Sequence, residues 1–370
     1  MGDMSEKLNL VITGAGGFIG RQTVAVARAR GHAVRAVVRK QASVPRDWQT
    51  DPMIEVVISD LAGDGAIEHL EAALDRTDAV IHAAAAMAGD DVQQTRDTVC
   101  ALEAVIATIV RQPRPRPRLV LVSSITVYDA LAMVPFAMLD ETSPIESTPQ
   151  SRDAYCRSKL QQEKLAVEAA RKHDLFVRIM RPGAVFGPGR IWNGHLGPRL
   201  GPVVLLVETR GEIPVSFIAH CAEALVLAAE VPITKDDYEV SDAPSDAPNL
   251  APSGAAGCVE VINVIDDDRP TRAGYMASLQ RPGQRTFVLG GIQWLLSKAA
   301  TALNALGLSR RLPGLLRPAI LAARMKPLTY SNARLRERLG WQPSSSFNEA
   351  MTTSLTQPAD WSVERHDRPD

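Results

Sequence analysis

The sequence lacks the features that mark several protein classes. Only 4 of its 370 residues are cysteine, and no two of them have the spacing of metal ligands or of a disulfide framework. This scarcity is typical of a reducing compartment, so we expect a cytoplasmic protein. No stretch approaches the roughly 20 consecutive apolar residues of a membrane-spanning helix, so we expect no membrane span. The 41 basic and 42 acidic residues nearly cancel, which argues against a nucleic-acid partner, because such proteins need a cationic excess.

Short apolar runs alternate with longer amphipathic segments along the first half of the chain. They predict strands over 8–13, 33–38, 54–59, 79–82 and 118–123, and helices over 20–30, 66–74, 95–110 and 154–170. Such alternation indicates βαβ units and a parallel sheet, whose buried strands are continuously apolar. The expected fold class is therefore α/β with a doubly wound parallel sheet. Further along, we expect a long surface loop over 232–257, a strand over 259–265, two or three amphipathic helices over 291–325, and a disordered tail over 357–370.

Three glycines follow the first predicted strand, in the segment LNLVITGAGGFIG. Gly14 permits a tight turn, Gly17 lets the backbone approach a pyrophosphate, and Gly20 lets the next helix pack close to the strand. The free N–H groups at that helix N-terminus favour bound phosphates. The segment predicts a dinucleotide-binding loop, and an ordinary turn is the alternative.

The second predicted strand ends in Val37-Val38-Arg39-Lys40, with no carboxylate nearby. An acidic residue at that point would bind the ribose 2′-hydroxyl of NAD. Arg39 instead suits a 2′-phosphate, which a guanidinium holds in a bidentate manner. We therefore expect NADP(H) as the cofactor, with loosely bound NAD as the alternative.

Tyr155 and Lys159 lie four residues apart in a predicted helix, on one face of it. The ordinary pKa of tyrosine, about 10, is too high for a base at neutral pH. A neighbouring cation favours the phenolate, and a shift to about 7 needs about 4 kcal/mol. About 30 residues upstream, a buried strand ends in Ser123 and Ser124, at the edge of a parallel sheet that faces ligands. Either hydroxyl can bind a reacting oxygen, and a strand-end cap is the alternative.

These segments resemble the extended short-chain dehydrogenase/reductase family. The motifs are TGAGGFIG, VIHAAA (80–85), VSSITVY (122–128), YCRSK (155–159) and RPGAVFGPG (181–189), and the similarity covers roughly 8–350. That family includes nucleotide-sugar epimerases and dehydratases, dihydroflavonol-type reductases and 3β-hydroxysteroid dehydrogenases. The resemblance implies a Rossmann sheet over 1–186 with later returns near 213–230 and 259–265. It also implies a smaller substrate-binding region over 187–212 and 266–356.

The resemblance also implies a role for each motif residue. Tyr155 is the catalytic acid/base, Lys159 binds the nicotinamide ribose and lowers the Tyr155 pKa, and Ser124 orients the substrate oxygen. Asp60 and Leu61 contact adenine, with a turn cap as the alternative for Asp60. The full expected set of cofactor contacts is Gly14, Gly17, Phe18, Ile19, Arg39, Lys40, Asp60, Leu61, Ala83, Ala84, Tyr155, Lys159, Pro182 and Val185.

The chain departs from the family pattern in three places. Gln94 stands where the family usually has Asn, and His220 stands where it often has Asp; we expect His220 to be structural. Ile125 and Thr126 replace the Asp-Glu pair with which sugar 4,6-dehydratases perform the elimination. That replacement disfavours 4,6-dehydration.

Two enzyme readings and one non-enzymatic reading remain open. The first is 4-epimerisation or 4-keto reduction of a nucleotide-linked sugar, with Arg190 and Arg199 near the diphosphate. The second is reduction or oxidation of an apolar ketone or alcohol beside the helices of 291–325. The third is a non-catalytic NADP(H) sensor, which the presence of Ser124, Tyr155 and Lys159 argues against. A homodimer through the helices over 95–110 and 154–171 is a further expectation.

Overall fold

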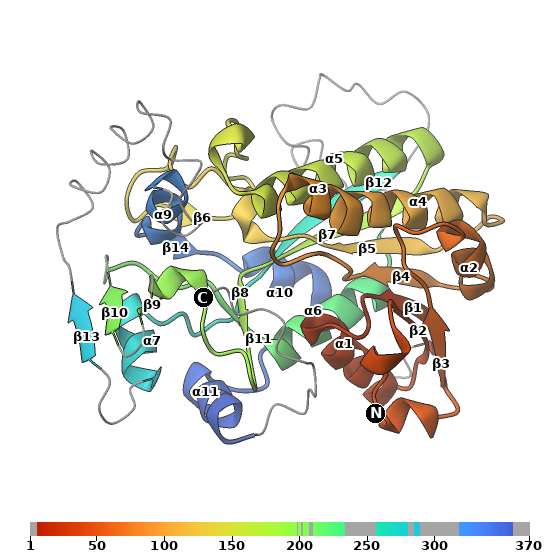
Figure 1. Ribbon diagram of the computed structural model, residues 1–370, viewed down its shortest axis with the longest axis horizontal. Helices are drawn as coiled ribbons and strands as arrows, with labels where there is room; N and C mark the ends of the chain where they lie inside the picture. The colour runs from red at the N-terminus through yellow and green to blue at the C-terminus, as the bar shows by residue number, and fades with distance from the viewer. Residues whose placement is uncertain are drawn as a thin grey trace.

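One large parallel sheet organises the molecule (Figure 1). The computed structural model describes residues 6–197, 199–200, 203–206, 210–233, 257–279, 285–288 and 318–357. The sheet order is β12-β7-β5-β4-β1-β2-β3, and every neighbouring pair is parallel. The strands are β1 Asn9–Thr13, β2 Ala33–Val38, β3 Ile54–Ile58, β4 Ala79–His82, β5 Arg118–Val122, β7 Phe176–Pro182 and β12 Cys258–Val264. The predicted doubly wound α/β sheet is confirmed.

Helices cover both faces of this sheet (Figure 1). Leu10 and Ile12 of β1 pack with α1 Phe18–Ala29 and α6 Ile218–Glu230, whereas Val11 packs with α2 Ala66–Ala73, α4 Ala101–Arg111 and α5 Ala154–His173. Successive strand residues point to opposite faces, so a continuously apolar strand feeds two cores at once. The chain order reverses between β1 and β4, and in open α/β sheets ligands bind outside the carboxyl ends of the strands at such a point.

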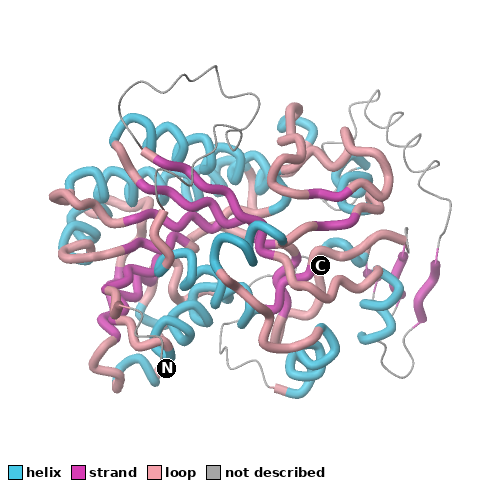
Figure 2. Tube along the Cα trace, turned by 180° about the vertical axis from the view of Figure 1, so that it is seen from behind, coloured by secondary structure: helices cyan, strands magenta, loops and turns pink. Residues whose placement is uncertain are grey.

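The smaller elements gather at one side of the large sheet (Figure 2). Phe186, Tyr275 and Phe347 pack their rings together there, with centroids 5.4–6.1 Å apart. These rings come from β8 Ala184–Phe186, α7 Arg272–Leu279 and α11 Phe347–Thr356, which lie far apart in sequence. The other small elements are β11 Val215–Phe217, which pairs with β8, β6 Met138–Leu139 with β14 Thr329–Tyr330, β9 Arg199–Leu200 with β10 Val203–Leu206 and β13 Arg285–Val288, and helix α9 Pro318–Met325. Helix α10 Ala333–Leu339 instead packs against β12 and α6.

One predicted helix is wrong in its detail. The segment 95–110 is not one α-helix but follows α3 Asp91–Gln94 as a π-helix, Thr95–Cys100, and then continues as α4. Such π-turns are rare and appear frequently at functional sites.

Several predictions fall outside the described residues. They concern most of the loop over 232–257, the side chain of Arg199, the tail after 357, and the helices over 291–325 except for α9. Within the described part of the chain, no helix is long and apolar enough to cross a membrane. The division into a dinucleotide-binding part and a substrate-binding part stays a prediction.

Candidate active site

A cavity of about 280 Å³ lies at the carboxyl ends of the central strands, beside the glycine loop. Gly14 has a φ of +65°, and a Cβ there would lie 2.7 Å from the Ala84 Cα. A Cβ at Gly20 would lie 2.1 Å from the Gly14 carbonyl oxygen, so α1 packs onto the loop as the glycine spacing predicts. Of the predicted cofactor residues, the cavity is lined by Gly14, Gly17, Arg39, Asp60, Leu61, Ala83 and Ala84.

Two polar groups in this cavity suit an adenosine. Ser59 is 4% exposed, and its hydroxyl oxygen has no hydrogen-bond partner although it lines the cavity. Such a buried orphan calls for a ligand or water. Asp60 accepts a hydrogen bond from the Ala62 N–H, so it caps a turn while it also faces the cavity. Burial alone would raise the pKa of Asp60, but hydrogen bonding to Arg96 keeps it below its ordinary value.

Arg39 lies at the edge of the cavity and already has a partner. Its Nη1 is 3.3 Å from Oδ2 of Asp97, and Arg96 binds the other oxygen of Asp97 at 2.5 Å. The Asp97 side chain is only 7% exposed, whereas that of Arg39 is 49% exposed. Sequence reasoning missed Asp97, because nothing in the π-helix segment indicates that it faces β2. A 2′-phosphate at this edge would share Arg39 with the carboxylate.

Besides Tyr155 and Lys159, five of the predicted cofactor residues do not line this cavity. The Phe18 ring lies beneath the Arg190 guanidinium, 5.4 Å from its centroid, and Ile19 packs into two apolar clusters. Lys40 is exposed, Pro182 is buried and Val185 is half-buried. Contacts of these five with other parts of a dinucleotide stay predictions.

The two serines after β5 have different surroundings. Ser123 is 3% exposed, and its hydroxyl donates to Oε1 of Glu163 at 2.5 Å. Glu163 also binds the buried Arg181 through two bonds of 2.9 and 2.7 Å. Ser124 instead forms a hydrogen bond with Tyr155. The structure therefore places Ser124, and not Ser123, beside the tyrosine, and the catalytic role that the resemblance implies for Ser124 stays a prediction.

Lys159 is buried beneath Tyr155. Its Nζ donates to the Val122 carbonyl at 2.8 Å and to Oε1 of Gln162 at 2.9 Å, and it lies 5.9 Å from the centroid of the Tyr155 ring. Burial lowers the pKa of Lys159 to about 7. It also lowers the pKa of His82, at the end of β4, to about 3, so this imidazole is neutral.

The phenol of Tyr155 is held in its protonated form in this structure. Burial raises its pKa, and the hydrogen bond with Ser124 and the charges of Arg190 and Arg324 only partly offset that effect. The effect of Lys159 and the cofactor on this pKa, which the resemblance implies, stays a prediction. Arg324, on α9, was missed by sequence reasoning; it donates to Asp153 at 3.1 Å.

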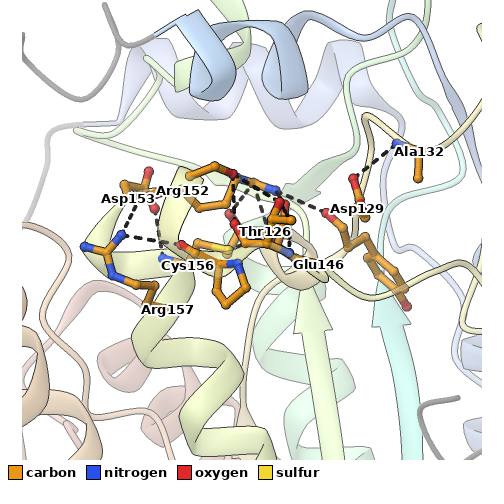
Figure 3. Close-up of polar contacts among 12 residues, drawn as sticks. Thr126, Asp129, Ala132, Glu146, Arg152, Asp153, Cys156 and Arg157 are labelled. Carbon is orange, nitrogen blue, oxygen red and sulfur yellow. Dashed lines mark hydrogen bonds and ion pairs between the residues drawn. The ribbon is translucent and has the colours of Figure 1, made fainter. Parts of the chain in front are cut away.

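A buried ion pair fixes the start of α5 (Figure 3). Arg152 is 5% exposed and lies 2.5 Å from Oε2 of Glu146. It also donates to the Thr126 carbonyl at 3.2 Å, and the Cys156 thiol donates to the same oxygen. Asp153 caps α5 by accepting from the Cys156 N–H at 2.8 Å. These contacts hold the segment after Ser124 against the turn that carries Tyr155.

The family departures occupy structural positions. The Gln94 amide donates to the Ala86 and Ala88 carbonyls, and no hydrogen bond between Gln94 and Lys159 is found among the described side chains. His220 is 1% exposed and packs its ring against those of Phe217 and Trp341. The Gln94 oxygen also accepts from the Ser158 hydroxyl of α5 at 2.9 Å. No contact of the Gln94 or His220 side chain with Tyr155 is found among the described residues.

Known proteins share part of this sequence and its fold. A family model described as "NAD dependent epimerase/dehydratase family" matches residues 10–207. Cinnamoyl-CoA reductase 1 of Arabidopsis thaliana is 29% identical over 186 residues, which cover 48% of this chain and 52% of that protein. The enzyme of the same name from Oryza sativa subsp. japonica is 30% identical over 200 residues, with coverage of 50% and 55%. The chain thus spans about half the length of the curated relatives it matches.

Solved structures share the fold at low sequence identity. An epimerase of Methanothermobacter thermautotrophicus superposes with a TM-score of 0.65 at 16% identity, over 95% of this chain and 91% of that one. UDP-glucuronic acid 4-epimerase from Bacillus cereus, in complex with NAD, gives 0.62 at 14% identity, with coverage of 94% and 97%. The solved structures share the fold, and the family match shows that the chain belongs to the NAD dependent epimerase/dehydratase family.

Proposed function

We propose that the protein transfers hydride between NADP(H) and a carbinol or carbonyl carbon of a small molecule that carries an anionic group, with a nucleotide-linked sugar as the first candidate. The observation that carries the proposal is the meeting of Ser124, Tyr155 and Lys159 beyond the carboxyl end of β5. Arg190 and Arg324 add positive charge beside the phenol, which suits a diphosphate or another anionic group.

Each side chain has a distinct role in this reaction. Ser124 donates a hydrogen bond to the substrate oxygen, and Tyr155 exchanges a proton with that same oxygen at its phenol. The ammonium of Lys159 would bind the ribose of the cofactor through its remaining N–H donor. The bound nicotinamide supplies the hydride acceptor or donor, and its positive charge in the oxidised form favours the phenolate. Arg39 binds the 2′-phosphate.

A second candidate is the reduction of an aromatic or otherwise apolar carbonyl compound. The similarity to two cinnamoyl-CoA reductases favours it, and so does Arg39, because an epimerase regenerates its own cofactor and a net reductase draws on NADPH. A homodimer through α4 and α5 stays a prediction.

The test is oxidation of NADPH and NADH by purified protein with two panels of substrates. One panel holds nucleotide-linked 4-keto sugars, and the other holds apolar ketones and aromatic acyl-CoA thioesters. Turnover of the nucleotide-linked sugars supports the first candidate function. Turnover of the apolar ketones or thioesters alone supports the second candidate instead. With nucleotide sugars, isomer analysis also detects redox-neutral epimerisation. Tyr155→Phe should lower turnover by about 10²–10⁴-fold and leave cofactor binding intact; full activity of this variant would refute the assigned role.

A further inference from the structure

Gln162 lies one turn after Lys159 and connects the ammonium to the neighbouring helix. Its Oε1 accepts a hydrogen bond from the Lys159 Nζ at 2.9 Å. Its Nε2 donates to the Thr98 carbonyl at 2.8 Å and makes a long contact of 3.5 Å with Nε2 of His82. Gln162 is completely buried, and Lys159 is 3% exposed.

These partners determine how the Gln162 amide is oriented. A flipped amide would place its NH₂ group against the ammonium and its oxygen against the Thr98 carbonyl, so both contacts would be repulsive. Only one orientation satisfies the ammonium and the carbonyl together. The oxygen therefore faces Lys159.

The Thr98 carbonyl lies within the π-helix Thr95–Cys100. It already accepts from the Ala101 N–H, where the π-helix passes into α4, and a carbonyl oxygen has a second lone pair for Gln162. The interruption that sequence periodicity did not predict thus coincides with the contact that anchors Gln162.

We infer that Gln162 is a positioning residue, which holds the Lys159 ammonium in its charged form and directs it toward the cofactor. This inference rests on the proposed function, in which Lys159 acts at the ribose. Lysine has three N–H donors; the Val122 carbonyl and Gln162 take two of them. One donor is left for the ribose.

The charged form of Lys159 needs such support. The ionisable groups that face it are His82 from β4 and Tyr155 and Glu163 from α5. His82 is neutral at physiological pH and Tyr155 is protonated. Burial lowers the pKa of Lys159 and the charge of Glu163 opposes that shift, but the Glu163 oxygens are already bound to Arg181 and Ser123. The neutral Gln162 oxygen is therefore the side-chain acceptor that binds the ammonium directly.

The test compares Gln162→Met with Gln161→Met, which changes an exposed glutamine next to it on the same helix. Methionine keeps the length of the side chain and removes both hydrogen bonds. NMR of ¹³C-labelled lysine follows the titration of Lys159, and its signal is assigned by its loss in Lys159→Met. The titration midpoint should fall by about one pH unit in Gln162→Met and stay unchanged in Gln161→Met. An unchanged midpoint in Gln162→Met would overturn the inference whether or not any substrate is turned over.

A second variant covers the case in which Gln162→Met does not fold. Gln162→Glu places a carboxylate against the ammonium, so the midpoint should rise, which is a shift of opposite sign.

Where a substrate is found, loss of the ammonium sets the basic limb of the pH–rate profile. This limb should move to lower pH in Gln162→Met, with a roughly tenfold loss of kcat one unit above neutrality and little change in KM. Absence of turnover in the wild-type protein would count against the proposed function alone, because the titration does not depend on it.

Discussion

Replacement of Arg39 by glutamine should change cofactor choice more than cofactor affinity in general. Removal of the guanidinium costs a 2′-phosphate its charge-assisted hydrogen bonds, each worth about 1.5–3 kcal/mol in a protected site. The Arg39 side chain is 49% exposed and shared with Asp97. Solvent screening therefore reduces the total loss of binding free energy to about 1.5 kcal/mol. The Kd for NADP⁺ should therefore rise about tenfold, whereas the Kd for NAD⁺ should stay within about twofold.

The assay is titration calorimetry of both dinucleotides with the wild type and two variants. Asp97→Asn provides the opposite perturbation, because it removes the carboxylate that competes with the phosphate for Arg39. It should lower the Kd for NADP⁺ a few-fold and leave the Kd for NAD⁺ unchanged. Equal losses of affinity for both cofactors in Arg39→Gln would show that the residue supports the fold of the cavity edge. The assignment of NADP(H) would then be withdrawn.

Three further predictions concern stability and reactivity. Gly20→Ala should destabilise the protein by at least about 2 kcal/mol, because its Cβ would lie 2.1 Å from the Gly14 carbonyl oxygen; unchanged urea denaturation would contradict this packing. Burial alone would raise the pKa of Glu230, but hydrogen bonds from a histidine and an arginine lower it to about 2. The ionised form of Glu230 should therefore contribute on the order of 2 kcal/mol to the free energy of unfolding above about pH 4.5. This contribution should be lost as the pH falls toward 2. Glu230→Gln should flatten that dependence whereas Glu223→Gln, on the same helix, should not; equal acid profiles would refute the assignment. Burial raises the pKa of the Cys156 thiol to about 12, so mass spectrometry should find it unmodified by iodoacetamide at neutral pH in the folded protein and modified after denaturation.

The sheet was predictable because its strands are buried on both faces. The segments 33–38 and 79–82 coincide with β2 and β4, since continuous apolar runs have few other uses in an α/β chain. The glycine spacing likewise predicted the loop, as the Gly14 conformation requires. The local sequence therefore predicted those features that depend on a single strand or a single loop.

The contacts between elements were not predictable. Ser123 and Ser124 are chemically equivalent in sequence, and only the placement of Glu163 and Tyr155 separates them. The π-helix leaves no periodic signal, because one additional residue per turn resembles ordinary variation in an amphipathic pattern. The roles of Asp97 and Gln162 depend on how α4 and α5 pack, which a single sequence does not encode locally.

The edge strand β12 limits how this enzyme can be recombined with its relatives. Glu260 of β12 binds Arg178 of β7 at 2.6 Å and Arg338 of α10 at 2.5 Å, and Arg178 is 2% exposed. A chain cut after β8 would leave this buried guanidinium without a carboxylate, and breaking such a pair costs about 3–5 kcal/mol. A chimera that exchanges the later half to alter substrate choice must therefore keep β12 and α10 with the recipient sheet and replace only the segments between and after them.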